Sequence, residues 1–145
     1  MLHFLQQGTL AWTLATGVND APYLAAVADS ANVPAALFIA IAEVEGGRSG
    51  RNNLVGKAGE LGRMQINPSV WCRVADSACV RRLKGYRHNV RRAAAILRWC
   101  YDRHGSWRVA TLCYNGDIRS PDTVRYLARV ERVLGRIVLA SEEAQ

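Results

Sequence analysis

Hydrophobic residues recur with helical spacing along most of the chain, and the alternation typical of β-strands is scarce. We therefore predict a mainly α-helical protein. The pattern predicts helices over 22–31, 34–45, 106–115 and from Ser120-Pro121 onward, a long one between Asn89 and Gly105, and short ones at 68–71 and 76–83. The helix after Pro121 is expected to face the core with a set of five apolar residues, Val124, Leu127, Val130, Leu134 and Ile137.

The segment PAALFIAIAEVE, residues 34–45, is apolar on nearly every face until its last three residues. A helix of this kind is normally central to a core, and Pro34 suits its first position. Gly46-Gly47 is expected to end it. Residues 48–65 contain four further glycines, too many for a stable helix. We expect a structured glycine-rich loop there, or a small β-hairpin, beside the central helix.

The helix that follows Asn89 has the clearest two-sided pattern in the chain. Val90, Ala93, Ala94, Leu97, Cys100 and Tyr101 share one side, and arginines take the other. Asn89 is a candidate cap at the start and Gly105 at the end. Together these elements predict one compact bundle of helices around the apolar one.

The 145 residues are half hydrophobic, which suits a single domain spanning 1–145. Residues 1–20 are ambiguous: they make a poor signal peptide, and a short first helix is the alternative. No apolar stretch reaches the roughly 20 residues of a membrane span. The net charge of +7 favours a polyanionic partner, such as nucleic acid, an anionic membrane or the carboxylate-bearing bacterial wall. No nucleic-acid-binding motif is evident, so we expect no nucleic-acid partner.

The four cysteines include no C-x-x-C pair, which argues against a zinc site, and we expect no metal or organic cofactor. Cys72 and Cys79 are candidates for a local disulfide, which would indicate an oxidising compartment. Cys100 and Cys113 fall on apolar helical faces, so we expect them to be buried free thiols.

Glu45 is the candidate catalytic residue. It shares a helical face with Phe38 and Ile41, so its carboxyl is expected to be partly desolvated at the carbonyl end of the helix. Both effects raise the pKa of a carboxyl group. A carboxyl that keeps its proton near neutral pH can act as a general acid in glycosidic cleavage. Glu43 is a competing candidate, because periodicity cannot choose between the two, and an ordinary solvated Glu45 is the alternative to both.

Four motifs occur in a fixed order: Glu45-Gly-Gly, GELGRMQINP at 59–68, CYNG at 113–116 and VRYLARV at 124–130. This order resembles the lytic transglycosylase catalytic domain of the SLT type, in the lysozyme-like superfamily. The resemblance covers roughly 22–133. It implies a lysozyme-like helical domain that cleaves peptidoglycan between N-acetylmuramic acid and N-acetylglucosamine, with a 1,6-anhydro product and no cofactor.

By this resemblance, Glu45 matches the single catalytic acid/base. Met64 and Gln65 match the pair that lines the sugar subsites, and an amide such as Gln65 can both donate to and accept from an acetamido group. Tyr114 and Asn115 match the floor of the cleft, and Tyr126 matches the tyrosine beside the acid. Each has a simpler structural interpretation, as core filler, core aromatic or turn residue.

The chain departs from the family at several positions. Gly46 stands where many relatives have Ser after the acid, Gly56 stands where another Ser is common, and Arg63 replaces a usual Leu. Glu60 replaces a small residue. If it faces Glu45, Glu60 could activate water and make the enzyme a hydrolytic muramidase, with Asp76 a weaker candidate for that role. A non-catalytic peptidoglycan-binding module is a further alternative.

The resemblance also suggests where such a protein works. We expect a monomer in the periplasm or cell envelope that acts on peptidoglycan glycan strands. Small single-domain relatives often act with a secretion, conjugation or pilus machine, or with a phage particle, and the sequence does not choose among these settings.

Overall fold

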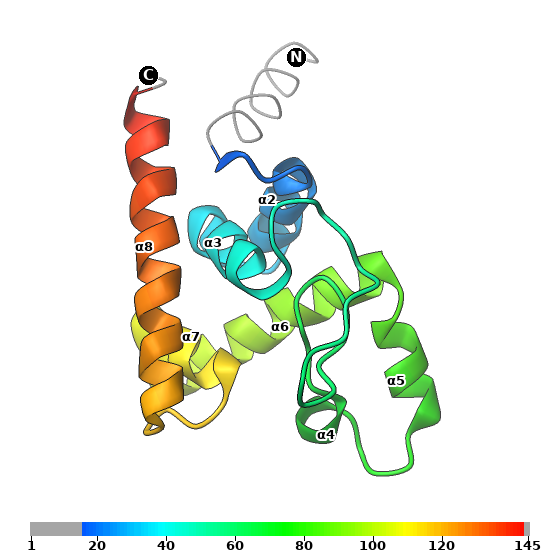
Figure 1. The fold of residues 1–145 in the computed structure, drawn as a ribbon. Helices are drawn as coiled ribbons and strands as arrows, with labels where there is room; N and C mark the ends of the chain where they lie inside the picture. Colours follow the sequence, from blue (N-terminus) through cyan, green and yellow to red (C-terminus); the bar gives the residue numbers. More distant parts are fainter. Residues whose placement is uncertain (1–15, 144–145) are drawn as a thin grey trace.

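The computed structural model describes residues 16–143, so most of the ambiguous N-terminal segment lies outside the described residues. The described part is built from helices, as predicted, and forms no β-strand (Figure 1). The helices are α2 (Ala21–Ser30), α3 (Ala35–Gly46), α4 (Pro68–Trp71), α5 (Ser77–Leu83), α6 (Tyr86–His104), α7 (Trp107–Asn115) and α8 (Pro121–Glu143). None of these helices is long and apolar enough to cross a membrane.

Helix α3 is the central element, as its apolar sequence predicts. Every residue from Leu37 to Ala42 is buried, and α3 packs against α2 and against α8 (Figure 1). Pro34 lies one position earlier than predicted: it is the N-cap residue, with extended ψ, rather than the first helical residue. The acidic end of α3 emerges from this core beside the glycine-rich loop.

The glycine-rich segment between α3 and α4 is a loop and not a β-hairpin. Two isolated antiparallel bridges, Val55 to Leu61 and Leu61 to Ile66, are all that it forms of a sheet. Gly62 explains part of this geometry, because its φ is +78° and a Cβ there would come closer than 3.0 Å to the side chains of Asn52 and Asn89. The loop is therefore shaped by polar anchors that press against its backbone.

Asn89 is one of these anchors, and the prediction that it caps the long helix is wrong. Helix α6 begins earlier, after Gly85. Asn89 is fully buried in its first turns; its side-chain oxygen accepts from Met64 N, and its amide nitrogen donates to the carbonyls of Leu61 and Leu83, each at 2.9 Å. The Asn89 amide therefore bonds to the loop and to the end of α5, and the first residues of α6 have no side-chain cap. Gly105 ends α6 in the left-handed conformation, as predicted.

The cysteines form two disulfides. Cys72 pairs with Cys79, as predicted, and links the end of α4 to α5. Cys100 pairs with Cys113, with the two Cα atoms 5.8 Å apart, so the prediction of buried free thiols is wrong. The apolar faces that carry these two cysteines pack against each other where α6 meets α7, and this contact brings the sulfur atoms together.

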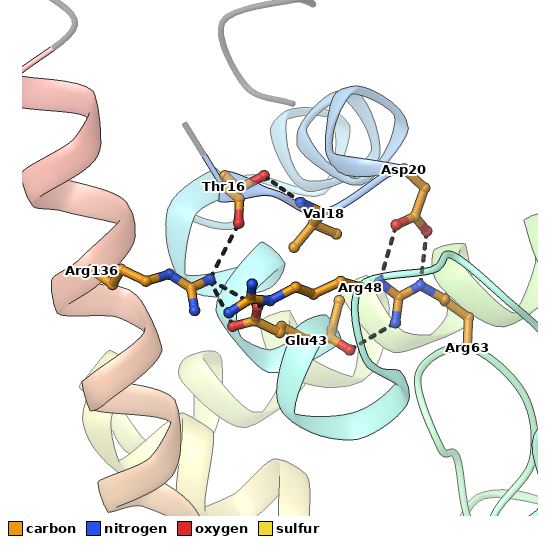
Figure 2. A network of polar contacts seen from close by, with 8 residues as sticks. Thr16, Val18, Asp20, Glu43, Arg48, Arg63 and Arg136 are labelled. Carbon is orange, nitrogen blue, oxygen red and sulfur yellow. Dashed lines mark hydrogen bonds and ion pairs between the residues drawn. The ribbon is translucent and has the colours of Figure 1, made fainter. Parts of the chain in front are cut away.

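Helix α8 covers α3 with a face slightly different from the predicted one. Val124 is 54% exposed, whereas Tyr126, Leu127, Val130 and Ile137 are buried. Two polar contacts fix the upper part of α8, where Arg136 donates to both carboxylate oxygens of Glu43, at 2.8 and 2.9 Å (Figure 2). Helix α8 is thus held in register against the acidic end of α3.

Candidate active site

Glu45 lies in the last turn of α3 and borders a cleft between the glycine-rich loop, α4, α6 and α7. The cleft is also lined by Glu60, Gln65, Ile66, Asn67, Val70, Trp71, Ile96, Cys113, Tyr114, Asn115 and Gly116. Its walls therefore combine one acidic helix end, an amide-bearing loop and an aromatic residue of α4.

The protonation of Glu45 is set by its surroundings. Burial raises the pKa of its carboxyl from 4.5 to about 7. The Tyr126 hydroxyl and the Arg129 guanidinium act in the opposite direction, and the charge of Glu60 adds to the rise in pKa. Desolvation therefore dominates, and the group holds its proton over most of the range below neutral pH.

Tyr126 lies directly beside this carboxyl. It is 2% exposed, and its hydroxyl oxygen is buried without a hydrogen bond of regular geometry to any described residue. Its interaction with Glu45 is nevertheless strong enough to lower the pKa of that carboxyl, while burial and the Glu45 charge raise the pKa of Tyr126. The Arg129 guanidinium lies over the Tyr126 ring, 5.9 Å from its centroid.

Gln65 and Met64 follow each other in the loop but face different surroundings. Gln65 lines the cleft. Its backbone φ is +50°, which residues other than glycine rarely adopt, and its amide nitrogen donates to the Gly62 carbonyl at 2.8 Å. Backbone strain of this kind often occurs at functional sites. Met64 is fully buried in the core and is not among the residues that line the cleft.

Tyr114 and Asn115 end α7 on the opposite side of the cleft. Tyr114 is buried, and its hydroxyl donates to the Met64 carbonyl at 2.8 Å, so α7 supports the backbone of the loop. Burial, with the Glu45 charge, raises the pKa of Tyr114. Asn115 is exposed, with its side chain available at the rim of the cleft.

Glu60 lines the same cleft as Glu45, and Gly56 makes room for it. A Cβ at Gly56 would come closer than 3.0 Å to a Glu60 carboxylate oxygen and to the Gln65 amide oxygen. The Glu60 carboxylate also accepts a hydrogen bond from Ala58 N at 3.0 Å. The chain thus holds a carboxylate in the space that a Ser side chain, expected from the family resemblance, would take at position 56.

The other acidic candidates have structural contacts instead. Glu43 accepts hydrogen bonds from Arg48 and Arg136, away from the cleft (Figure 2). Asp76 caps α5 by accepting from Cys79 N at 3.0 Å. Neither is among the residues that line the cleft.

Arg63, the departure from Leu, is fully buried and ties the loop to the core (Figure 2). Its guanidinium donates twice to the Asp20 carboxylate, at 2.8 and 3.0 Å, and once to the carbonyl of Ala42 in α3, at 2.7 Å. Burial raises the pKa of Asp20, but hydrogen bonds from Arg63 and Tyr86 outweigh it and leave that pKa below its ordinary value. Gly46 is required beside it, because a Cβ there would come closer than 3.0 Å to the Arg63 carbonyl oxygen.

Sequence reasoning did not identify Trp71 and Arg129 as neighbours of the site. Trp71 lines the cleft, and Arg129 acts on the Glu45 pKa from α8. The signal for Arg129 was present, since it lies three residues after Tyr126 and therefore on the same side of a helix.

The fold and this half-buried acid define a lysozyme-like domain of the kind that cleaves glycans. Comparison of the sequence with protein families makes this specific: the chain belongs to the transglycosylase SLT domain family, which matches residues 22–129. This membership makes it a lytic transglycosylase by family, with peptidoglycan as its substrate class. Comparison with curated proteins and with solved structures gave no match.

Proposed function

We propose that the protein cleaves the β-1,4 bond between N-acetylmuramic acid and N-acetylglucosamine in peptidoglycan and leaves a 1,6-anhydro-muramyl end. The observation that supports this most is the Glu45 carboxyl at the edge of the cleft. Burial raises its pKa to about 7, so that it keeps its proton at pH values below this. A protonated carboxyl in that position meets the first requirement of glycosidic cleavage, a general acid for the leaving oxygen.

One carboxyl serves both steps. Glu45 gives its proton to the glycosidic oxygen as the bond from that oxygen to the muramyl anomeric carbon breaks. The resulting carboxylate takes the proton of the muramyl 6-hydroxyl as O6 bonds to the anomeric carbon, so Glu45 is again protonated and no water is consumed. We assign Tyr126 to positioning the carboxyl, because its buried hydroxyl acts on the Glu45 pKa and has no hydrogen bond of regular geometry to any described residue.

The remaining predicted residues are assigned to substrate binding or to supporting it. Gln65 and Asn115 would bind acetamido groups from opposite sides of the cleft, since an amide both donates and accepts. Met64 and Tyr114 would act one step back: the hydrogen bond between the Tyr114 hydroxyl and the Met64 carbonyl supports the turn that presents Gln65.

The test is product analysis of digested sacculi. Wild-type protein is expected to release anhydro-muropeptides, which are one water lighter than hydrolysis products in mass spectrometry. Glu45→Gln should lower the rate by at least about 100-fold, within the range for loss of a general acid, while keeping the circular dichroism spectrum. Undiminished turnover by Glu45→Gln would remove Glu45 from the mechanism, and binding without cleavage by the wild type would indicate a wall-binding module.

Hydrolysis is the second candidate, because Glu60 shares the cleft and its charge acts on Glu45. An inverting hydrolase places its two carboxyl groups about 6.5–9.5 Å apart around a water molecule. Glu60→Gln separates the two mechanisms. If the enzyme is a transglycosylase, this variant keeps its anhydro products; if it is a hydrolase, products with reducing ends predominate in the wild type and disappear in the variant.

We further place the protein in the periplasm or cell envelope, where its substrate lies. Two disulfides between described residues support an oxidising compartment. Action as a monomer beside a secretion, conjugation or pilus machine, or in a phage particle, remains a prediction of the family resemblance.

A further inference from the structure

A second tryptophan, Trp99 of α6, packs against Trp71 at the edge of the cleft. The Trp71 and Trp99 rings meet edge to face, with their centroids 5.5 Å apart. Trp71 lines the cleft, whereas Trp99 is 47% exposed, although tryptophan normally buries most of its large surface. An exposed indole in contact with a cleft residue offers a flat apolar surface to whatever extends out of the cleft.

Two arginines flank this surface. Arg92, Trp99 and Arg103 are spaced by seven and four residues, so they share one side of α6. Arg92 donates to the Trp71 carbonyl at 3.2 Å, and the Arg103 guanidinium lies over the Trp99 ring, 4.7 Å from its centroid. Neither arginine forms an ion pair with a carboxylate of the described side chains.

A further arginine, Arg82, acts together with Arg92 on His88 near the start of α6. His88, one turn before Arg92, has its pKa lowered by burial and then by the charges of Arg82 and Arg92. Arg92 and Arg103, without carboxylate partners and next to the two tryptophan rings, favour a ligand that has both a flat apolar face and an anionic group.

We propose that Trp71, Trp99, Arg92 and Arg103 form a further subsite that binds a peptide-bearing sugar of the same glycan strand. This subsite rests on the proposed function, since it takes peptidoglycan as the substrate. The Trp99 ring stacks on the strand as it leaves the cleft. Arg92 and Arg103 bind carboxylates of the stem peptide, so the enzyme prefers strands that carry their peptides over bare glycan.

The experiment measures binding in a Glu45→Gln background, so that no cleavage is required. The probes are soluble glycan strands with their stem peptides and the same strands after an amidase has removed the peptides. The Glu45→Gln protein, which is the parent of the variants below, is expected to bind the peptide-bearing strands about tenfold more tightly than the strands without peptides, as for a few strong contacts. Trp99→Ala should weaken binding of both probes, and Arg92→Gln with Arg103→Gln should weaken only that of the peptide-bearing strands.

Arg132→Gln is the matched control, because Arg132 is exposed on α8 and forms no ion pair with a described side chain. It should leave both affinities unchanged. If the double arginine variant loses affinity for both probes equally, or loses none, the proposal is overturned. If the wild type fails to cleave sacculi while the parent still discriminates between the probes through Arg92 and Arg103, the catalytic proposal fails and the subsite stands.

Discussion

At the scale of single residues, two glycines explain how this chain differs from the family pattern. Gly46 and Gly56 each stand where the family resemblance leads us to expect Ser, and each lies against another departure from that pattern, Arg63 and Glu60 respectively. The obstacle at Gly46 is a backbone carbonyl, which cannot move without the loop. The obstacle at Gly56 is the end of a flexible carboxylate side chain, which can rotate away. The first substitution is therefore structural, and the second bears on the chemistry of the cleft.

The raised pKa of Glu45 predicts a pH dependence of both activity and stability. The folded pKa of about 7 exceeds the ordinary value of 4.5, so the folded protein binds more protons between these values. Stability from this group is fully present below about pH 4.5 and is lost as pH rises through about 7, by about 3 kcal/mol in total. The kcat/KM for glycan cleavage should also fall above about pH 7, because Glu45, the proposed general acid, loses its proton.

Urea unfolding of the wild type and Glu45→Gln at pH 5 and pH 8 measures the stability effect. The variant cannot ionise at this position. Its free energy of unfolding should therefore rise relative to that of the wild type between pH 5 and pH 8. All other titrating groups are shared and cancel in the comparison. A constant difference between the two proteins would mean that Glu45 is not desolvated in solution.

At the scale of elements, the disulfide between Cys100 and Cys113 joins α6 to α7 at one wall of the cleft. Cys113 lines the cleft and directly precedes Tyr114, whose hydroxyl supports the loop. Helical periodicity could not predict this pairing, because it treats each helix alone and says nothing about which two faces meet. The local pair Cys72 and Cys79 was predictable because few residues separate them.

Loss of this disulfide should destabilise the protein and loosen the cleft. Cys100→Ala with Cys113→Ala is expected to lower the free energy of unfolding by about 3 kcal/mol, as for closure of a short loop. The control is Arg132→Gln, because Arg132 is exposed on α8 and is not among the residues that line the cleft. Thermal unfolding measures both effects, and KM for glycan should rise only in the first variant. Equal KM values would show that α7 is held without the disulfide.

At the scale of the whole molecule, helical periodicity predicted the helical fold, and the apolar run at 34–45 predicted a central helix with an acid at its end. It could not predict how the glycine-rich loop is held, because the anchors come from distant positions. Asn89 looked like a helix cap, and only the packing of α6 under the loop turns its amide toward Met64. Arg63 looked like a simple departure from Leu, and its partner Asp20 lies 43 residues away.

The buried Arg63 is expected to be a major determinant of stability. Arg63→Leu restores the residue common in relatives, but it leaves Asp20 and the Ala42 carbonyl without their donor. Breaking a buried pair of this kind costs about 3–5 kcal/mol. Urea unfolding measures the loss, with Arg132→Gln as the exposed control, for which a change within about 0.5 kcal/mol is expected. A loss no larger than in the control would contradict a central role for Arg63.

The contact between Gly46 and the Arg63 carbonyl also limits how this enzyme can be recombined with its relatives. A side chain at position 46 would strike the main chain of residue 63, and Leu at position 63 would leave that main chain in place, so reverting the two positions together does not remove the obstacle. A chimera must therefore exchange the whole stretch from the end of α3 to the start of α4 as one unit. It must also carry Asp20 and Asn89, the side chains that hydrogen-bond to this stretch. Chimeras that divide this unit should yield insoluble protein. Chimeras that exchange it whole, with Asp20 and Asn89, should fold.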